Sequence, residues 1–238
     1  MACGDYHSRA SIPLLTAVNF RKNQTLPKRP LIERPLMALL SKHPERNVIR
    51  LELKHNEVLK ELDDADRERL EAHMTVFDGS KGDVLLYQGV REMEQYFILD
   101  GILKRVVSNP EGKEMILRFA DRNDIETSYA AWRLGTPTPY GIVCVTKVRV
   151  VRMPLKEWVA FLDERPQAKA SFELYVMRLM SEIMAHTITL HLLDAQGRVH
   201  RFVRKHPDLV DRIPQKQLAS YLNLSAETLS RLRQSGKI

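Results

Sequence analysis

With 238 residues, of which 44% are hydrophobic, the chain suits one large domain or two modest ones with buried cores. No apolar run approaches the roughly 18 residues of a membrane helix, and no signal-peptide stretch follows Arg9. The two cysteines, Cys3 and Cys144, form neither a disulfide framework nor a metal-binding pair. We therefore expect a cytoplasmic protein. The net charge of +7 is unevenly distributed: residues 1–50 carry +6, residues 51–195 carry −5 and residues 196–238 carry +6. The basic C-terminal segment suits either phosphate binding or a solvated surface.

The first half of the chain changes from irregular to β-rich. Residues 1–48 contain five of the twelve prolines without helical or strand periodicity, which predicts a poorly ordered basic extension. Apolar positions amid charges at 56–74 predict one or two short amphipathic helices. Turn residues then separate short β-rich runs, at 84–87, 96–99, 102–107, 115–119 and 142–151. This spacing predicts an antiparallel sandwich or roll.

After Pro166 the apolar period becomes helical and predicts a long helix over residues 166–195. Heptads counted from Phe172 place apolar residues at six of seven core positions, the exception being His186. Such a seam favours pairing with a second chain over packing on the helix's own domain. Met177, Met180 and Met184 form a second stripe, so one face could meet the partner and the other the roll. The predicted dimer seam consists of Phe172, Val176, Leu179, Ile183, His186, Leu190 and Leu193.

The last segment, residues 196–238, has the pattern of a helix-turn-helix. Pro214 stands where a short helix would begin, Asn223 and Leu224 form the turn, and Ser225 caps a second helix. That second helix would expose a polar face toward a major groove while its leucines face inward.

These motifs resemble a known family. The run IPQKQLASYLNLSAETLSRLR at 213–233 resembles the DNA-binding motif of the Crp/Fnr superfamily, and KGDVLLYQG at 81–89 with YFILDG at 96–101 resembles its cyclic-nucleotide-binding β-roll. The resemblance runs from about residue 55 to residue 238, and the basic extension is unmatched. Ala226 replaces an arginine frequent in the catabolite-activator branch, so the match is closer to the Fnr-like branch.

The resemblance implies an α+β fold with three parts: a jelly-roll-like antiparallel β-roll sensor domain over residues 49–165, a dimerisation helix over 166–195 and a helix-turn-helix over 196–238. Only seven residues follow Arg231, so we expect the family's wing to be truncated or absent. The implied function is that of a homodimeric transcription regulator that reads an inverted repeat in double-stranded DNA and has RNA polymerase as a further partner.

Within this resemblance, Glu227, Ser230 and Arg231 correspond to the signature that reads base edges. Their chemistry agrees, because arginine donates twice to guanine, glutamate accepts from the cytosine amino group and serine can serve either role. Phosphate contacts or positioning are expected from Gln215, Lys216, Ser225, Thr228 and Arg233.

The expected effector differs from cAMP. In the family's cyclic-nucleotide binders, a Gly-Glu pair holds the ribose and an arginine before Ser/Thr pairs with the cyclic phosphate. Here Glu126 is kept, but Ile125 replaces the glycine and no arginine lies between Thr136 and Val148. The roll therefore senses another small molecule or serves as an unliganded scaffold. The candidate pocket residues are Glu126, Thr127, Ser128, Thr138 and Tyr140.

No cofactor, metal site or catalytic residue is predicted. A Fnr-type iron–sulfur cluster needs four thiolates, which two cysteines do not supply. The sequence has no phosphate-cradling glycine loop, HExxH or GxSxG, which argues against an enzyme. Two alternatives remain: a heme-based gas sensor with His186 or Cys144 as axial ligand, and a β-roll signalling or interaction protein without specific DNA binding.

Overall fold

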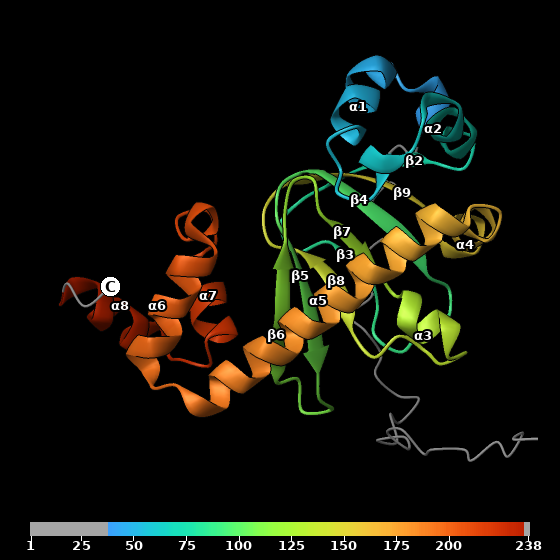
Figure 1. Cartoon of the computed structure of the whole chain (residues 1–238). Helices are drawn as coiled ribbons and strands as arrows, with labels where there is room; N and C mark the ends of the chain where they lie inside the picture. Colours follow the sequence, from blue (N-terminus) through green and yellow to red (C-terminus); the bar gives the residue numbers. More distant parts are fainter. Residues whose placement is uncertain (1–37, 236–238) are drawn as a thin grey trace, which may run out of the picture. The chain divides into compact units, whose positions relative to one another are not determined.

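The computed structural model of the chain describes residues 38–235, which form an α+β structure (Figure 1). Its strands form two antiparallel sheets, with the orders β1-β2-β9-β4-β7 and β3-β8-β5-β6. The strands are β1 (Ala38–Leu39), β2 (Thr75–Gly79), β3 (Val84–Leu86), β4 (Glu94–Asp100), β5 (Leu103–Ser108), β6 (Glu114–Ala120), β7 (Ile125–Thr127), β8 (Gly141–Cys144) and β9 (Val148–Pro154). The predicted antiparallel roll is therefore confirmed.

One apolar core joins the two sheets. Tyr96 and Ile98 of β4 are fully buried and belong to the same cluster as Leu103 of β5 and Ile142 of β8. Strand β4 is buried at five consecutive positions, which explains why its sequence is a continuous apolar run rather than an alternating one. Gly101 follows β4 with a φ of +85°, and a Cβ atom there would lie 2.2 Å from the carbonyl oxygen of Lys147. Only glycine fits this turn.

Short helices cover the five-stranded sheet. They are η1 (Leu40–Lys42), α1 (Arg46–Leu53), η2 (Leu59–Glu61), α2 (Asp64–Glu71), α3 (Tyr129–Arg133) and α4 (Leu155–Asp163). The short helices expected within 56–74 are η2 and α2, and Asp63 caps α2 by accepting from the backbone N–H of Asp66 at 2.8 Å. Trp158 of α4 is fully buried and packs edge-on against Phe97 of β4.

The expected boundary of the N-terminal extension is wrong for its last residues. Residues 38–48 form β1, η1 and the start of α1, and Leu40 and Ile49 are fully buried in the sensor core. Pro44 lies in this segment, but Leu40 and Ile49 on either side of it pack in the same core as Val76, Phe97 and Val151 of the sheet. The expected poor order of residues 1–37 lies outside the described residues.

The long helix α5 (Pro166–Leu192) begins at the predicted residue, with proline in its first turn. It runs from the roll toward the C-terminal helices (Figure 1). Among the helices of residues 38–235, none is long and apolar enough to cross a membrane.

The first part of the predicted seam of α5 is buried within its own chain. Phe172, Val176 and Leu179 are buried in the core of their own chain, with 0%, 9% and 4% of their surface exposed. Ile183 lines a pocket against the C-terminal helices, and His186 stacks on a tyrosine there. These five side chains pack within their own chain, whereas Leu190 is half-buried and Leu193 is exposed, so the seam beyond His186 stays a prediction. The exposed apolar stripe of α5 instead consists of Leu174, Met177, Met180, Met184, Ile188 and Leu192, with Leu193 following the helix.

Candidate functional site

The C-terminal segment contains α6 (Ala195–Lys205), η3 (Pro207–Leu209), α7 (Gln215–Tyr221) and α8 (Ala226–Gln234). Helices α7 and α8 are joined by a tight turn in which Asn223 has a φ of +52°, a conformation that asparagine tolerates better than most residues. Ser225 caps α8, because its hydroxyl accepts from the backbone N–H of Thr228 at 3.1 Å. Leu229 of α8 is fully buried, and Leu218 of α7 is 1% exposed. The predicted pair of helices and its turn are thus present.

The three candidate base-reading residues lie on the outer face of α8. Positions 230 and 231 follow position 227 by three and four residues, so each is its neighbour on one side of the helix. Glu227 and Arg231 are exposed, and Ser230 is half-buried. Hydrogen bonds from its own backbone N–H and from Ser225 lower the pKa of Glu227, which keeps it a carboxylate at neutral pH. This face therefore combines an acceptor and a guanidinium donor at the helix surface.

The candidate phosphate-binding residues divide into two groups. Gln215 and Lys216 are exposed at the start of α7 and have free reach into solvent. Ser225 and Thr228 are engaged in the cap of α8, where their hydroxyl oxygens lie 3.0 Å apart. Arg233 is exposed and donates to the carbonyl oxygen of Val210 at 3.5 Å. Of these candidates, Gln215 and Lys216 are the two whose side chains are not fixed by a helix cap or a backbone contact within residues 38–235.

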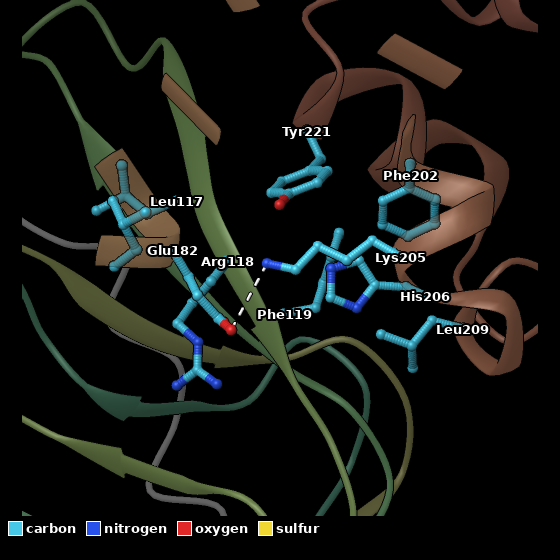
Figure 2. Close-up of a pocket in the computed structure, with 10 residues that line it drawn as sticks. Leu117, Arg118, Phe119, Glu182, Phe202, Lys205, His206, Leu209 and Tyr221 are labelled. Carbon is cyan, nitrogen blue, oxygen red and sulfur yellow. Dashed lines mark ion pairs between the residues drawn. The ribbon is translucent and has the colours of Figure 1, made fainter. Parts of the chain in front are cut away.

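The helix-turn-helix packs on the outer side of β6 in the roll. Figure 2 shows Tyr221 and Phe202 on the helical side facing Phe119 on the strand. The rings of Phe119 and Tyr221 have centroids 5.1 Å apart, and Tyr221 also stacks on His186 of α5 at 3.8 Å. Ile102, Ile116, Phe119 and Val145 of the roll belong to the same buried cluster as the apolar residues of α6, α7 and α8. Arg212 adds an ion pair with Asp121 at 2.9 Å.

The two side chains considered as heme ligands are occupied within the protein fold. Nε2 of His186 lies 3.1 Å from the carbonyl oxygen of Tyr221, and burial lowers the pKa of this histidine to about 4. Burial likewise raises the pKa of the Cys144 thiol to about 12. Within residues 38–235 no cluster of three His, Cys, Asp or Glu side chains could hold a metal ion. The protonated thiol is buried in the core of the roll, and the neutral imidazole is half-buried against Tyr221.

The candidate effector residues come together inside the roll. All five are buried: Glu126, Thr127, Ser128, Thr138 and Tyr140. Ser128 donates to the hydroxyl of Thr138 at 3.3 Å, and the Tyr140 hydroxyl donates to the carbonyl oxygen of Thr127 at 2.7 Å. Glu126 is 0% exposed, so its carboxylate needs partners within the chain.

Two arginines supply those partners. Arg105 of β5 donates to Oε2 of Glu126 from Nε at 3.0 Å and from Nη2 at 2.6 Å. Arg118 of β6 donates from Nη1 to Oε1 of the same carboxylate at 2.9 Å. The Arg105 guanidinium also lies 4.2 Å from the centre of the Tyr140 ring. We call Arg105, Arg118 and Glu126 the arginine–glutamate cluster.

Comparison with known proteins shows which regulators this chain is similar to. Residues 79–165 match the family model of the cyclic nucleotide-binding domain. The cAMP-activated global transcriptional regulator CRP of Escherichia coli is 20% identical over 171 residues, which cover 68% of this chain and 81% of that protein. Among solved structures, FixK2 from Bradyrhizobium japonicum has a TM-score of 0.61 at 16% identity, covering 68% of this chain and 86% of that one. The c-di-GMP responsive global regulator CLP of Xanthomonas campestris has a TM-score of 0.60 at 13% identity, covering 73% and 92%.

The chain is thus similar in sequence to CRP and in fold to FixK2 and CLP. The predicted resemblance is thereby confirmed, and the arginine–glutamate cluster lies within the domain that matches the family model. Sequence reasoning found Glu126 in this roll but missed Arg105 and Arg118. Charged residues flanked by apolar ones were the available signal, since Arg118 interrupts the run from Met115 to Ala120, and Arg105, next to Lys104, stands before Val106 and Val107.

Proposed function

We propose that the protein is a transcription regulator that binds an inverted-repeat operator in double-stranded DNA as a homodimer. The observation that carries this proposal is the capped helix α8, which directs Glu227 and Arg231 outward while Leu229 anchors the helix in the core. An exposed helix with this side-chain chemistry suits the major groove. The protein would act in the cytoplasm, where chromosomal DNA and RNA polymerase are available to it.

The exposed stripe of α5 supports the homodimer. Leu174, Met177, Met184 and Ile188 are each at least half exposed, and their spacing is that of heptad core positions. A symmetric pair of chains would present two copies of α8 to half-sites about one helical turn apart, roughly 10 base pairs centre to centre. A homodimer therefore implies an operator with two-fold symmetry.

Two roles are open for the roll: a sensor of a small molecule other than cAMP, and a scaffold without a ligand. The buried ion pairs around Glu126 favour the scaffold, because both carboxylate oxygens already accept hydrogen bonds from arginine. A regulator of this kind would depend on its own concentration or on a protein partner for control.

Selection of genomic DNA fragments by the purified protein tests the proposal. Arg231→Ala should lower the affinity for the selected operator by about 1–3 kcal/mol and relax selectivity at one base pair per half-site. Lys216→Ala is the matched control, because loss of a phosphate contact weakens all sequences alike and reduces the salt slope by about one unit.

Two outcomes would contradict the proposal. An Arg231→Ala protein with unchanged sequence preference, only uniformly weaker binding, would remove the base-reading role of α8. Absence of any salt-sensitive DNA binding by the parent protein would favour the alternative of a β-roll signalling or interaction protein. A Soret absorption band in the purified protein would instead support the heme-sensor alternative.

A further inference from the structure

The interior of the roll holds two like charges directly opposite each other. Arg105 of β5 and Arg118 of β6 are register partners in the antiparallel pair, and both side chains are buried, at 2% and 8% exposure. Like charges in this arrangement repel each other, and burial strengthens the repulsion. The pair therefore needs a counterion between the two guanidinium groups.

Glu126 of β7 is that counterion. One of its oxygens accepts two hydrogen bonds from Arg105, and the other accepts from Arg118. Asp124 balances the second positive charge through an ion pair with Arg118. The arginine–glutamate cluster and Asp124 together carry two positive and two negative charges, so the four side chains are neutral without any added ion.

Arg105 also satisfies the groups around Glu126. Its Nη2 donates to the carbonyl oxygen of Thr127 at 3.2 Å, and its guanidinium covers the ring of Tyr140. A single side chain of the protein thereby makes the contacts to a carboxylate, a carbonyl and an aromatic face that a bound polar ligand would make. These contacts lie inside the segment that matches the cyclic nucleotide-binding domain.

The arginine–glutamate cluster is connected to the helix-turn-helix through β6 and to helix α5 through Asp124. Figure 2 shows the Arg118 guanidinium directed away from Tyr221, while the neighbouring Phe119 faces the helix-turn-helix. Strand β6 is therefore held by Glu126 on its inner side and packs against α7 on its outer side. On α5, the hydroxyl of Tyr175 donates to Asp124 at 2.5 Å, which links the dimer helix to the same ion pairs.

We propose that Arg105 is a built-in ligand of the roll, which occupies the site around Glu126 and closes it to cyclic nucleotides. By this contact Arg105 also fixes the position of β6 on which the helix-turn-helix docks. DNA binding therefore needs no diffusible effector. The part that concerns DNA rests on the function proposed above, whereas the closure of the site does not. The readouts below separate the two.

The first experiment adds cAMP, cGMP and c-di-GMP to the full-length protein. Isothermal titration calorimetry should show no saturable heat, the melting temperature should stay constant and operator affinity should not change, because a ligand stabilises only the state it binds. A saturable heat accompanied by a rise in melting temperature for any of the three nucleotides would overturn the proposal. This result would be independent of whether the protein binds DNA.

The second experiment is chemical rescue of Arg105→Ala. Truncation leaves a buried carboxylate without its bidentate partner, which should lower the melting temperature by about 10 °C. Ethylguanidinium chloride, exchanged for sodium chloride at constant ionic strength, should restore part of this loss and strengthen operator binding. Arg149→Ala is the matched control, since Arg149 is partly exposed and forms its ion pairs with Glu45 and Asp78 at the surface. An unchanged melting temperature for Arg105→Ala, or equal rescue of both variants, would refute the built-in ligand.

A double-mutant cycle covers the case in which single variants fail to fold. Glu126→Gln removes the carboxylate between the two opposed arginines and leaves Arg105 without an ion-pair partner in the cluster, whereas Arg105→Met combined with Glu126→Gln removes one charge of each sign. The double variant should have a higher melting temperature than Arg105→Met or Glu126→Gln alone. If the two single variants do not fold but the double variant does, that result supports the proposal equally. Additive losses in melting temperature would show that the two side chains act independently and would overturn the proposal.

Discussion

Replacing Met184 with glutamate tests whether the exposed stripe of α5 joins two chains. Met184 is 66% exposed, so about two-thirds of its side chain is available for burial in a dimer. A fully buried methionine contributes about 1.5–3 kcal/mol, which gives about 1–2 kcal/mol per chain and about 2–4 kcal/mol for the two copies in a dimer. Loss of this contact alone raises the dissociation constant about 30-fold to 1000-fold, and two buried carboxylates weaken the dimer further.

Light scattering coupled to size-exclusion chromatography measures this change at micromolar protein. We expect a dimer for the parent protein and a monomer for Met184→Glu. Met115→Glu is the matched control, because Met115 is a 50% exposed methionine on β6, away from the stripe. Ile183→Asp, the variant suggested by the predicted seam, should instead disturb the pocket against the helix-turn-helix. A parent protein that is monomeric, or a Met184→Glu variant that stays dimeric, would refute this use of the stripe.

Two further predictions concern the docking of the helix-turn-helix. Tyr221→Ala should lower the free energy of unfolding, measured by urea titration, by about 3–5 kcal/mol, because it removes a buried ring between Phe119 and His186. Tyr221→Phe keeps the ring and should lower this free energy much less. Equal losses for the two variants would contradict the packing argument. Burial, with minor contributions from Lys205 and other nearby positive groups, lowers the pKa of His186 from 6.5 to about 4, so the folded state prefers the neutral imidazole. The stability from this preference is complete above pH 6.5 and is lost as the pH falls toward 4. Urea unfolding near pH 7 and about pH 5 should therefore show a smaller difference for His186→Gln than for the parent protein, and an equal difference would exclude this histidine as the cause.

The strands were predictable where the sequence combines apolar runs with turn residues. The runs at 96–99 and 115–119 became β4 and β6 because Asp100, Gly101 and Asn109 interrupt the chain between them. Strand β2 was missed, since its five residues contain an aspartate and a glycine and pair with β9 only through tertiary contacts. Helix α4 follows Pro154 without a side-chain cap and was not predicted.

The sequence alone does not show which face of α5 packs on the roll and which face stays exposed. The helix has apolar residues on two sides, and heptad counting from Phe172 selects one side without knowing where the roll lies. Phe172 meets Tyr129 and Trp158, residues that are distant in sequence, so the fold takes this side and leaves the methionines outside. Arg105 was missed for a related reason: an arginine in a strand is normally exposed, and only the pairing of β4 with β7 reveals its buried counterion.

The shared core of the helix-turn-helix has a consequence for synthesis of the chain. During translation the strands of the roll leave the ribosome before α6, α7 and α8, and N-terminal domains generally fold first. The early roll then carries an uncovered apolar surface formed by Ile102, Ile116, Phe119 and Val145, the residues that the last helices cover in the finished protein. Nascent chains halted before α7 should therefore be substrates for chaperones that recognise exposed apolar surface, and chains released after α8 should escape them.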